Sequence, residues 1–337
     1  MVNVLASGVG GFLGHHLLAH LLEQTDWDIA ATDSFRHKGR ADRIALVLAA
    51  NPDWARRVTV ITHDLAAPFT QPMTDRLGPV DYIVANASQS HVDRSIEDPV
   101  PFVRNNIDVA LNTLELARQV QPRALILVST DEVYGPTEPG SAGHPEWVGC
   151  IPSNPYAASK VAQEALAISY WRSYGVPAVI INSMNMIGER QSSEKFLPKT
   201  IRHVLAGETV PVHGTPGNIG TRHYVHVRDV ADAILFILRD LPAPARFPQA
   251  DRPDRYNITG HKVSNLEMAQ LVADICGLPL HYELVDFHSA RPGHDPHYGL
   301  EPGKLAGLGW KPPGSFRESL ERTVRWQMAN PEWMADD

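Results

Sequence analysis

The chain has 337 residues, of which 43% are hydrophobic, and its formal net charge is -8. This length allows one large domain or two unequal ones, and the acidic balance argues against a dedicated nucleic-acid-binding protein, although a few local arginines suffice to hold a diphosphate. The two cysteines, Cys150 and Cys276, exclude a thiolate zinc cluster, and the scattered histidines include no metal-binding motif, so no metal site is predicted.

The chain begins with Met1 and a short apolar run, Val2–Ala6, without the charged segment and long apolar core of a signal peptide. No later run approaches the ~20 apolar residues that a membrane span needs. We therefore expect a soluble, cytoplasmic protein without a membrane or nucleic-acid partner.

Short β-branched runs alternate with amphipathic stretches, such as Phe12–Glu23 and Pro101–Gln119, through the first half of the chain. Such runs are typical of buried parallel strands. The alternation predicts an α/β fold with a Rossmann-type, doubly wound parallel sheet and ligands at the carboxyl ends of its strands. The predicted strands are Val2–Ala6, Asp28–Thr32, Val58–Thr62, Tyr82–Ala85, Leu125–Ser129 and Ala178–Asn182.

The pattern changes after Asn182, where proline and glycine become frequent and short elements mix without a clear period. We expect residues 1–182 to form the Rossmann domain and residues 183–330 to form a smaller C-terminal α/β lobe. Segments near residues 225–240, with a helix over Asp229–Arg239, are expected to return and pack on the sheet.

Gly8, Gly11 and Gly14 form a G-x-x-G-x-x-G loop between the first strand and the first helix. Glycine lets the chain turn tightly, lets the backbone approach a pyrophosphate and lets the helix pack closely on the strand. The helix N-terminus offers N–H groups and a positive dipole end to the anion. The loop therefore predicts a dinucleotide cofactor.

Asp33 ends the second strand, about twenty residues after this loop. A carboxylate there accepts from both ribose hydroxyls and repels a 2′-phosphate, which favours NAD over NADP. The basic side chains between residues 36 and 40 are the argument for NADP, and their alternative is a solvated loop. Asp64 could accept from an adenine amino group or serve as a turn residue. Small residues around Ala87 let a cofactor lie across the sheet.

Thr130, Asp131 and Glu132 follow a predicted central strand, and Tyr156 and Lys160 lie one helical turn apart. Lys160 is expected to lower the tyrosine pKa, as an oxidised nicotinamide would, and so to make the phenol a usable base. This pair suits proton removal from an alcohol during hydride transfer. The two carboxyls suit proton removal from carbon and protonation of a leaving hydroxyl. Together they predict oxidation, elimination of water and reduction in one site.

Each motif also has a plainer interpretation. Tyr156 and Lys160 alone describe a surface helix with a solvated lysine, and Asp131 with Glu132 describes an acidic helix N-terminus that the dipole stabilises. The helix dipole explains one carboxylate at a helix N-terminus, but it explains less well why two adjacent carboxylates lie at the mouth of a site. The glycine loop and the preceding Ser129 favour the catalytic interpretation.

Longer runs match motifs of a known family. The motif S-H-V-D-R-S-I is present at Ser90–Ile96, S-T-D-E-V-Y-G at Ser129–Gly135 and R-P-G-H-D at Arg291–Asp295. Asn154–Lys160 resembles S-P-Y-S-A-S-K, and Glu194–Pro198 resembles E-K-L-I-P. On these motifs the chain resembles, nearly end to end, the extended short-chain dehydrogenase/reductases of the NAD-dependent epimerase/dehydratase family. Within them it is most similar to the nucleoside-diphosphate-sugar 4,6-dehydratases, especially those that act on dTDP-glucose.

This resemblance implies an NAD-binding first domain, a C-terminal lobe for a nucleoside-diphosphate sugar, and a role for each catalytic residue. Thr130 would hydrogen-bond the sugar 4-hydroxyl, and Tyr156 would remove its proton as hydride leaves C4. Glu132 would take the acidified C5 proton, and a protonated Asp131 would give one to the departing 6-hydroxyl before hydride returns to C6. Like-charge repulsion encourages the two carboxyls to differ in protonation.

The resemblance also implies binding residues, among them arginines whose bidentate fork suits a diphosphate and whose plainer role is a surface salt bridge. The predicted substrate-binding residues are Ser90, Asn185, Lys195, Arg222 and Arg291, and the predicted cofactor-binding residues are Gly8, Gly11, Phe12, Leu13, Gly14, Asp33, Asp64, Leu65, Ala87, Ser129, Tyr156 and Lys160.

The chain departs from the family's motifs mainly around the sugar-nucleotide pocket. A different base or a modified hexose therefore fits the sequence. Gln89 stands where the family has glutamate, Met186 and Ile187 alter its N-N-Y-G run, His223 and Tyr224 replace D-W, and His297 replaces an arginine.

Other functions on the same scaffold stay open. A nucleotide-sugar 4-epimerase or uronate decarboxylase would use Tyr156 and Lys160 but would not require Asp131 and Glu132 together. A non-catalytic NAD-binding regulator would tolerate loss of Tyr156.

We also expect a homodimer, because in the family the helices around Pro101–Gln119 and Tyr156–Tyr174 pair with their symmetry mates. Small side chains would permit the close approach of these helices, and their alternative role is packing on the chain's own sheet. They are Ala157, Ala158, Ala162, Ala165 and Ala167.

Overall fold

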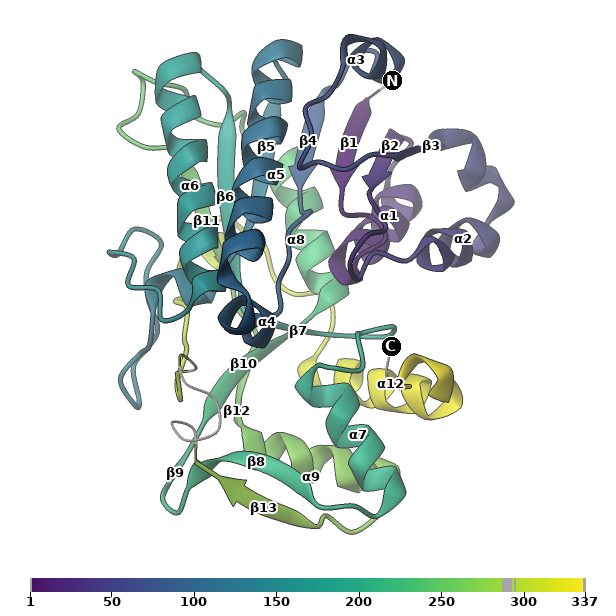
Figure 1. The fold of residues 1–337 in the computed structure, drawn as a ribbon, viewed down its shortest axis with the longest axis vertical. Helices are drawn as coiled ribbons and strands as arrows, with labels where there is room; N and C mark the ends of the chain where they lie inside the picture. The colour runs from purple at the N-terminus through teal and green to yellow at the C-terminus, as the bar shows by residue number, and fades with distance from the viewer. Residues whose placement is uncertain (1, 287–292, 294, 336–337) are drawn as a thin grey trace.

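The computed structural model describes residues 2–286, 293 and 295–335, and its main sheet has seven parallel strands (Figure 1). The strand order is β11-β6-β5-β4-β1-β2-β3. The predicted fold class, a Rossmann-type doubly wound sheet, is confirmed. The strands are β1 (Asn3–Ser7), β2 (Asp28–Asp33), β3 (Val58–Thr62), β4 (Tyr82–Ala85), β5 (Ala124–Thr130), β6 (Ala178–Ser183) and β11 (Asp254–Ile258).

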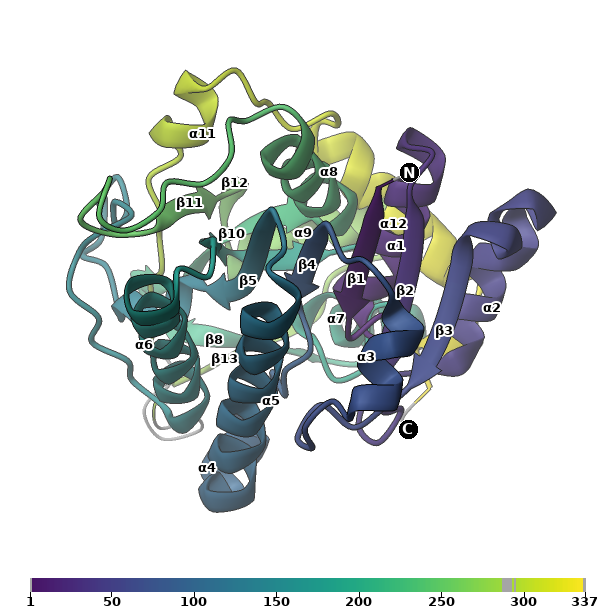
Figure 2. The ribbon, with the colours of Figure 1, turned by 90° about the horizontal axis from the view of Figure 1, so that it is seen from above.

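Helices cover both faces of this sheet, as the view from above shows (Figure 2). On one face α1 (Phe12–Gln24) packs against α8 (Val227–Arg239), and on the other α5 (Pro99–Val120) packs against α6 (Pro155–Tyr174). The shorter helices α2 (Ala41–Ala50), α3 (Gln71–Leu77) and α4 (Val92–Glu97) lie in the loops between strands.

Strand residues alternate between the two cores that these helices create. Val4 and Ala6 belong to the core under α1 and α8, whereas Leu5 belongs to the core under α5 and α6. Because successive side chains of a strand point to opposite faces, a strand that is buried on both sides is apolar throughout. This explains why the continuous apolar runs predicted the sheet.

The edge strand β11 is not among the predicted strands, although it pairs in parallel with β6. Its sequence alternates apolar and polar residues, and both Arg255 and Asn257 are buried. Their polar groups bond internally: the guanidinium contacts Glu164, and the amide donates to the His144 carbonyl at 2.9 Å. A buried strand can carry polar side chains when most of their groups pair internally in this way, so an apolar pattern does not reveal it.

Most of the chain after β6, apart from α8, β11 and the segment near residues 303–310, forms a smaller group of elements below the main sheet in Figure 1. Two three-stranded sheets, β12-β10-β7 and β13-β8-β9, pack with α7, α9 and α12 around a separate apolar core. Among the described residues, no helix is long and apolar enough to cross a membrane. The elements are β7 (Asn185–Ile187), α7 (Phe196–Ala206), β8 (Val210–Thr215), β9 (Asn218–Ile219), β10 (Thr221–His226), β12 (His261–Ser264), α9 (Asn265–Cys276), β13 (Tyr282–Val285) and α12 (Phe316–Ala329). Helix α11 (Gly303–Gly307) instead contacts β11, and its Leu305 belongs to the core under α1 and α8.

The chain order of the sheet reverses between β1 and β4, which are hydrogen-bonded neighbours. The loops that leave these two strands diverge to opposite faces, and such a switch point opens a crevice at the carboxyl ends. Gly8 directly follows β1, and Ala87 lies two residues after the end of β4, so the fold places the glycine loop at this crevice.

Candidate active site

A cavity of about 390 Å³ lies at the carboxyl ends of the sheet strands, bordered by β7 and the start of α7. Two of the predicted site residues that the structure describes, Gly14 and Arg222, do not line it, and all the others do. Arg291 lies outside the described residues. The fold thus brings the predicted catalytic, cofactor and most substrate residues to one cavity.

The glycine loop approaches its neighbours as closely as the motif predicts. Gly8 has φ +68°, and a Cβ there would lie 2.9 Å from the Cα of Ala87. A Cβ on Gly14 would lie 2.0 Å from the Gly8 carbonyl oxygen, so this glycine lets α1 pack under the loop. Gly11 is the N-cap of α1, and the first turn of the helix borders the cavity. Its N–H groups can therefore face an anion.

Asp33 and Asp64 end neighbouring strands on the cofactor side of the cavity. The Asp33 carboxylate accepts from the Gly10 N–H at 2.9 Å and from the Phe35 N–H at 2.8 Å, which fixes its orientation. Asp64 accepts from the Ala66 N–H at 3.1 Å, so it is a turn residue, while it also lines the cavity. Its second oxygen pairs with the Arg36 guanidinium at 2.6 Å.

The end of β5 runs directly into a short 3-10 helix, η2 (Asp131–Tyr134), which turns the two carboxyls toward the cavity. Thr130 is the N-cap, and its hydroxyl accepts from the Glu132 N–H at 3.4 Å and donates to Asp131 Oδ1 at 2.9 Å. Asp131 is 4% exposed, and its Oδ2 is buried with no hydrogen-bond partner among the described residues.

The environment of Asp131 favours its protonated form. Burial, reinforced by the charge of Glu132, raises the pKa of Asp131 to about 7. The Thr130 hydrogen bond and the positive charge of Arg222 act in the opposite direction without reversing the shift. A buried carboxyl with a pKa near neutrality is suited to general-acid chemistry.

Tyr156 and Lys160 lie in the first turns of α6 and both line the cavity. Burial raises the pKa of Tyr156, and so does the charge of Glu132. Burial lowers the pKa of Lys160 to about 8, and its ammonium donates to the Val128 carbonyl at 2.7 Å. In the protein without a cofactor, the predicted lowering of the Tyr156 pKa is therefore not seen, and Lys160 is bound to strand β5. For the NAD-bound protein it stays a prediction.

A buried polar network lies next to strand β5, the strand that ends at Thr130. Glu164, one helical turn after Lys160, accepts from Ser129 Oγ and from Asn182 Nδ2. Its other oxygen pairs with Arg255, and both side chains are at most 3% exposed. Asn182 Nδ2 also donates to the Thr130 carbonyl at 2.9 Å. Strands β5, β6 and β11 are thus locked to α6 next to the cavity.

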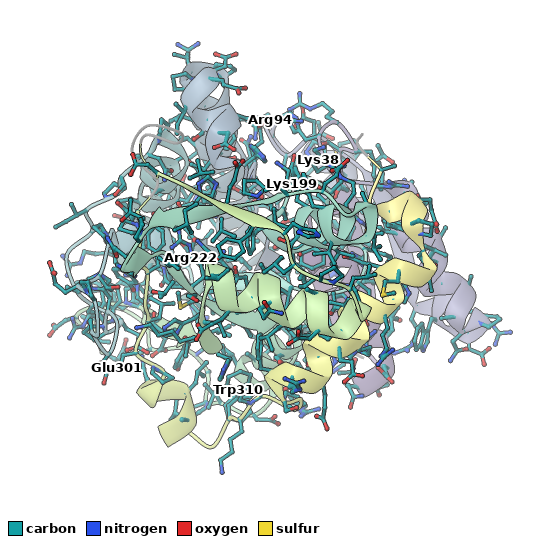
Figure 3. All side chains as sticks on the ribbon, turned by 90° about the horizontal axis from the view of Figure 1, so that it is seen from below. Lys38, Arg94, Lys199, Arg222, Glu301 and Trp310 are labelled. Atoms are coloured by element: carbon teal, nitrogen blue, oxygen red, sulfur yellow. The ribbon has the colours of Figure 1, made fainter. Side chains whose placement is uncertain are left out.

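Only some of the predicted substrate-binding residues line the cavity. Ser90, Asn185 and Lys195 line the cavity, and Lys195 Nζ lies 3.4 Å from the Ser90 carbonyl oxygen. The Arg222 guanidinium instead donates to the carbonyls of Thr221, Asp295 and Pro296 at 2.7–2.8 Å. Figure 3 shows Arg222 apart from Lys38, and only Lys38 of the two lines the cavity.

Of the positions that depart from the family's motifs, some line the cavity and others do not. Gln89, Met186, Ile187 and Tyr224 line the cavity, whereas His223 and His297 do not. Gln89 Nε2 lies 3.3 Å from His37 Nε2, which joins the loop after β2 to the loop after β4. His223 and His297 bond to the threonine hydroxyls of Thr259 and Thr221 at 2.9 and 2.8 Å.

Two residues that the sequence analysis missed contact this site. Arg94 lines the cavity, and the signal for it was its place inside the S-H-V-D-R-S-I motif (Figure 3). Asn154 donates from Nδ2 to Glu132 Oε2 at 3.0 Å. Its signal was a good N-cap residue directly before the Pro-Tyr pair that begins α6.

The chain resembles known proteins over nearly its whole length. The chain matches the NAD-dependent epimerase/dehydratase family model over residues 4–258. A dTDP-glucose 4,6-dehydratase of Streptomyces antibioticus is 33% identical over 341 residues, which cover 98% of this chain and 94% of that protein. A low-salt glycan biosynthesis protein of Haloferax volcanii is 31% identical over 332 residues, which cover 98% of this chain and 100% of that protein.

A solved structure shares the whole fold. The crystal structure of DesIV, a dTDP-glucose 4,6-dehydratase from Streptomyces venezuelae with NAD and TYD bound, has a TM-score of 0.85 and 30% identity, and the match covers 98% of both chains. The predicted cofactor, NAD, is the one for which the matching family is named. The chain belongs to the NAD-dependent epimerase/dehydratase family.

Proposed function

We propose that the chain is a nucleoside-diphosphate-hexose 4,6-dehydratase, a lyase that forms a 4-keto-6-deoxy sugar nucleotide with net loss of one water. The observation that carries this proposal is the carboxyl pair beside Tyr156. Asp131, with its pKa raised to about 7, and the adjacent Glu132 line the same cavity as this tyrosine. An acid and a base side by side suit an elimination, which epimerisation does not require.

The residues around the glycine loop fit an NAD cofactor. Gly8 and Gly11 leave room for a pyrophosphate against the first turn of α1, and the fixed Asp33 carboxylate lies where an adenosine ribose would need an acceptor. Bound NAD would take hydride from C4 of the hexose, return it to C6 and add a positive charge beside Tyr156. We assign cofactor binding to residues 1–182 with the packed-back α8, and sugar-nucleotide binding to residues 183–330.

The first proton transfer is the work of Tyr156 and Thr130. A hydrogen bond with the Thr130 hydroxyl lowers the pKa of Tyr156, although burial raises it more. Tyr156 takes the proton of the sugar 4-hydroxyl while Thr130 orients that hydroxyl, and C4 becomes a ketone. Lys160, bound to the β5 carbonyl, supplies a fixed positive charge near this step.

The carboxyl pair performs the elimination. The 4-ketone acidifies the C5 hydrogen, Glu132 removes it as a proton, and the C5–C6 double bond forms as the C6–O bond breaks. Protonated Asp131 donates to the departing 6-hydroxyl, which leaves as water. Hydride return to C6 then needs one proton at C5, and Glu132 gives it back. The oxidation and the reduction balance within one substrate.

Substrate binding and assembly complete the proposal. Asn185, Lys195 and Arg94 line the cavity from the substrate side, where positive charge suits a diphosphate. We also propose a homodimer through α5 and α6. Of the five alanines on α6, Ala157 and Ala167 are buried against the chain itself, whereas Ala158 and Ala165 are exposed and suit helix contact with a second copy.

The test is incubation of the purified protein with dTDP-, UDP-, GDP- and CDP-hexoses, followed by mass spectrometry. Loss of the mass of one water from any of them supports the proposal and names the substrate. A change of sugar stereochemistry at constant mass, seen by NMR, would show an epimerase instead, and loss of carbon dioxide from a uronate would show a decarboxylase.

A further inference from the structure

Asn154 connects the catalytic helix to one of the two carboxyls. Its Oδ1 accepts from the Ala157 N–H at 2.8 Å and so caps α6, the helix that carries Tyr156. Its Nδ2 donates to Glu132 Oε2 at 3.0 Å and to the Gly293 carbonyl at 3.2 Å. One amide therefore joins the start of α6, the η2 helix after β5 and Gly293.

The partners settle which way this amide points. Ala157 offers a backbone donor, whereas Glu132 and Gly293 offer acceptors only. A flipped amide would set its oxygen against the carboxylate and the carbonyl, and its NH₂ group against an N–H. Asn154 is 6% exposed, so bonds to water would not replace the hydrogen bonds lost in the flipped orientation.

We propose, on the basis of the proposed function, that Asn154 is a positioning residue for Glu132. The amide holds Oε2 of the carboxylate, which leaves Oε1 for the C5 proton of the sugar. The same side chain fixes the start of α6, so the proton acceptor for C5 and the tyrosine that acts at C4 are held in one geometry. The role belongs to the elimination step, because the amide contacts Glu132, and it is indirect, because Asn154 itself does not line the cavity.

Asn154→Ser isolates this role, since serine also caps a helix N-terminus well but has no second donor at the position of Nδ2. Asn154→Asp keeps the cap and the shape and replaces the donor by an acceptor. Both variants should fold and bind NAD as the parent does, and both should oxidise C4. We expect elimination to slow by about tenfold to a hundredfold, the scale of a displaced catalytic group.

The measurement follows the two steps separately in D₂O. Reduced cofactor, read by its ultraviolet absorbance after mixing with substrate, reports C4 oxidation. Deuterium at C5 of the product, read by mass spectrometry, reports proton exchange through Glu132. We expect the variants to accumulate reduced cofactor and to form deuterated product slowly, whereas the parent accumulates little.

Two outcomes would overturn the inference while leaving the function intact. Variants that form product at the parent's rate, without accumulation of reduced cofactor, would show that Glu132 needs no such support. Variants that lose C4 oxidation and elimination equally would show that Asn154 acts only through the α6 cap. A parent protein that dehydrates no hexose would overturn the proposed function and this inference with it.

Discussion

The Thr130 hydroxyl lies 2.9 Å from Asp131 Oδ1, and Oδ2 of the same carboxyl is buried with no hydrogen-bond partner among the described residues. A buried oxygen without a partner is costly when it carries charge. A carboxyl with a hydrogen bond to Oδ1 and none to Oδ2 is therefore suited to hold a proton on Oδ2. The geometry and the raised pKa of Asp131 point to the same protonation state.

Asp131→Asn should remove the acid while keeping the shape of the site. We expect kcat for dehydration to fall about 10²- to 10⁴-fold, the usual contribution of a general acid, while C4 oxidation persists. Dehydration assays together with the absorbance of reduced cofactor check both parts. Full turnover by Asp131→Asn would contradict the dehydratase proposal.

The pH profile tests the same group. Because the Asp131 pKa is raised to about 7, the acid form predominates below pH 7 and is lost as the pH rises through that value. Dehydration measured as kcat/KM should therefore decline on the alkaline side, starting near neutrality. Thr130→Val removes a hydrogen bond that lowers this pKa, so its alkaline limb should move to higher pH. A limb that stays in place would argue that another group titrates.

Arg255→Met tests the buried ion pair between Arg255 and Glu164, next to strand β5. The Glu164 carboxylate would remain buried without its counter-charge, and breaking such a pair costs about 3–5 kcal/mol. Chemical denaturation should show this loss, and Glu164→Gln in the same chain should recover part of it. As a control, Arg325→Ala breaks the exposed pair with Glu321 and should cost about 0–1 kcal/mol. Equal losses from the two single variants would refute the role of burial.

The parallel sheet was predictable because strands buried on both faces need continuous apolar runs. The glycine loop was predictable because a Cβ on Gly8 would lie only 2.9 Å from the Cα of Ala87. Strand β11 was not predictable, since the buried Arg255 and Asn257 pair with partners far away in sequence. The Asn154 contact with Glu132 spans a loop in the same way. Local sequence patterns therefore predict helices and strands. The protonation state of a site residue and the hydrogen bonds that hold it depend on residues that are distant in sequence.

Gly14→Ala tests the close packing of α1 under the loop. Its methyl group would meet the Gly8 carbonyl oxygen at 2.0 Å and the Val9 Cα at 2.6 Å, so the loop must move. Overpacking of this kind typically costs about 1–3 kcal/mol. We expect a lower midpoint of thermal unfolding and less NAD retained through gel filtration. Gly149→Ala, which meets nothing within 4 Å, is the matched control and should change neither quantity.

Ala165→Arg tests the proposed dimer. Ala165 is exposed on α6, and a long charged side chain there would separate two helices that approach through small residues. We expect the sedimentation mass to fall from twice the chain mass of 37.2 kDa to that of one chain, with the fold retained by circular dichroism. Ala55→Arg, exposed on the 3-10 helix Pro52–Arg57 beyond α2, is the control and should leave the mass unchanged. A parent protein that sediments as one chain at micromolar concentration would refute the dimer, and the outward-facing alanines of α6 would then be ordinary surface residues.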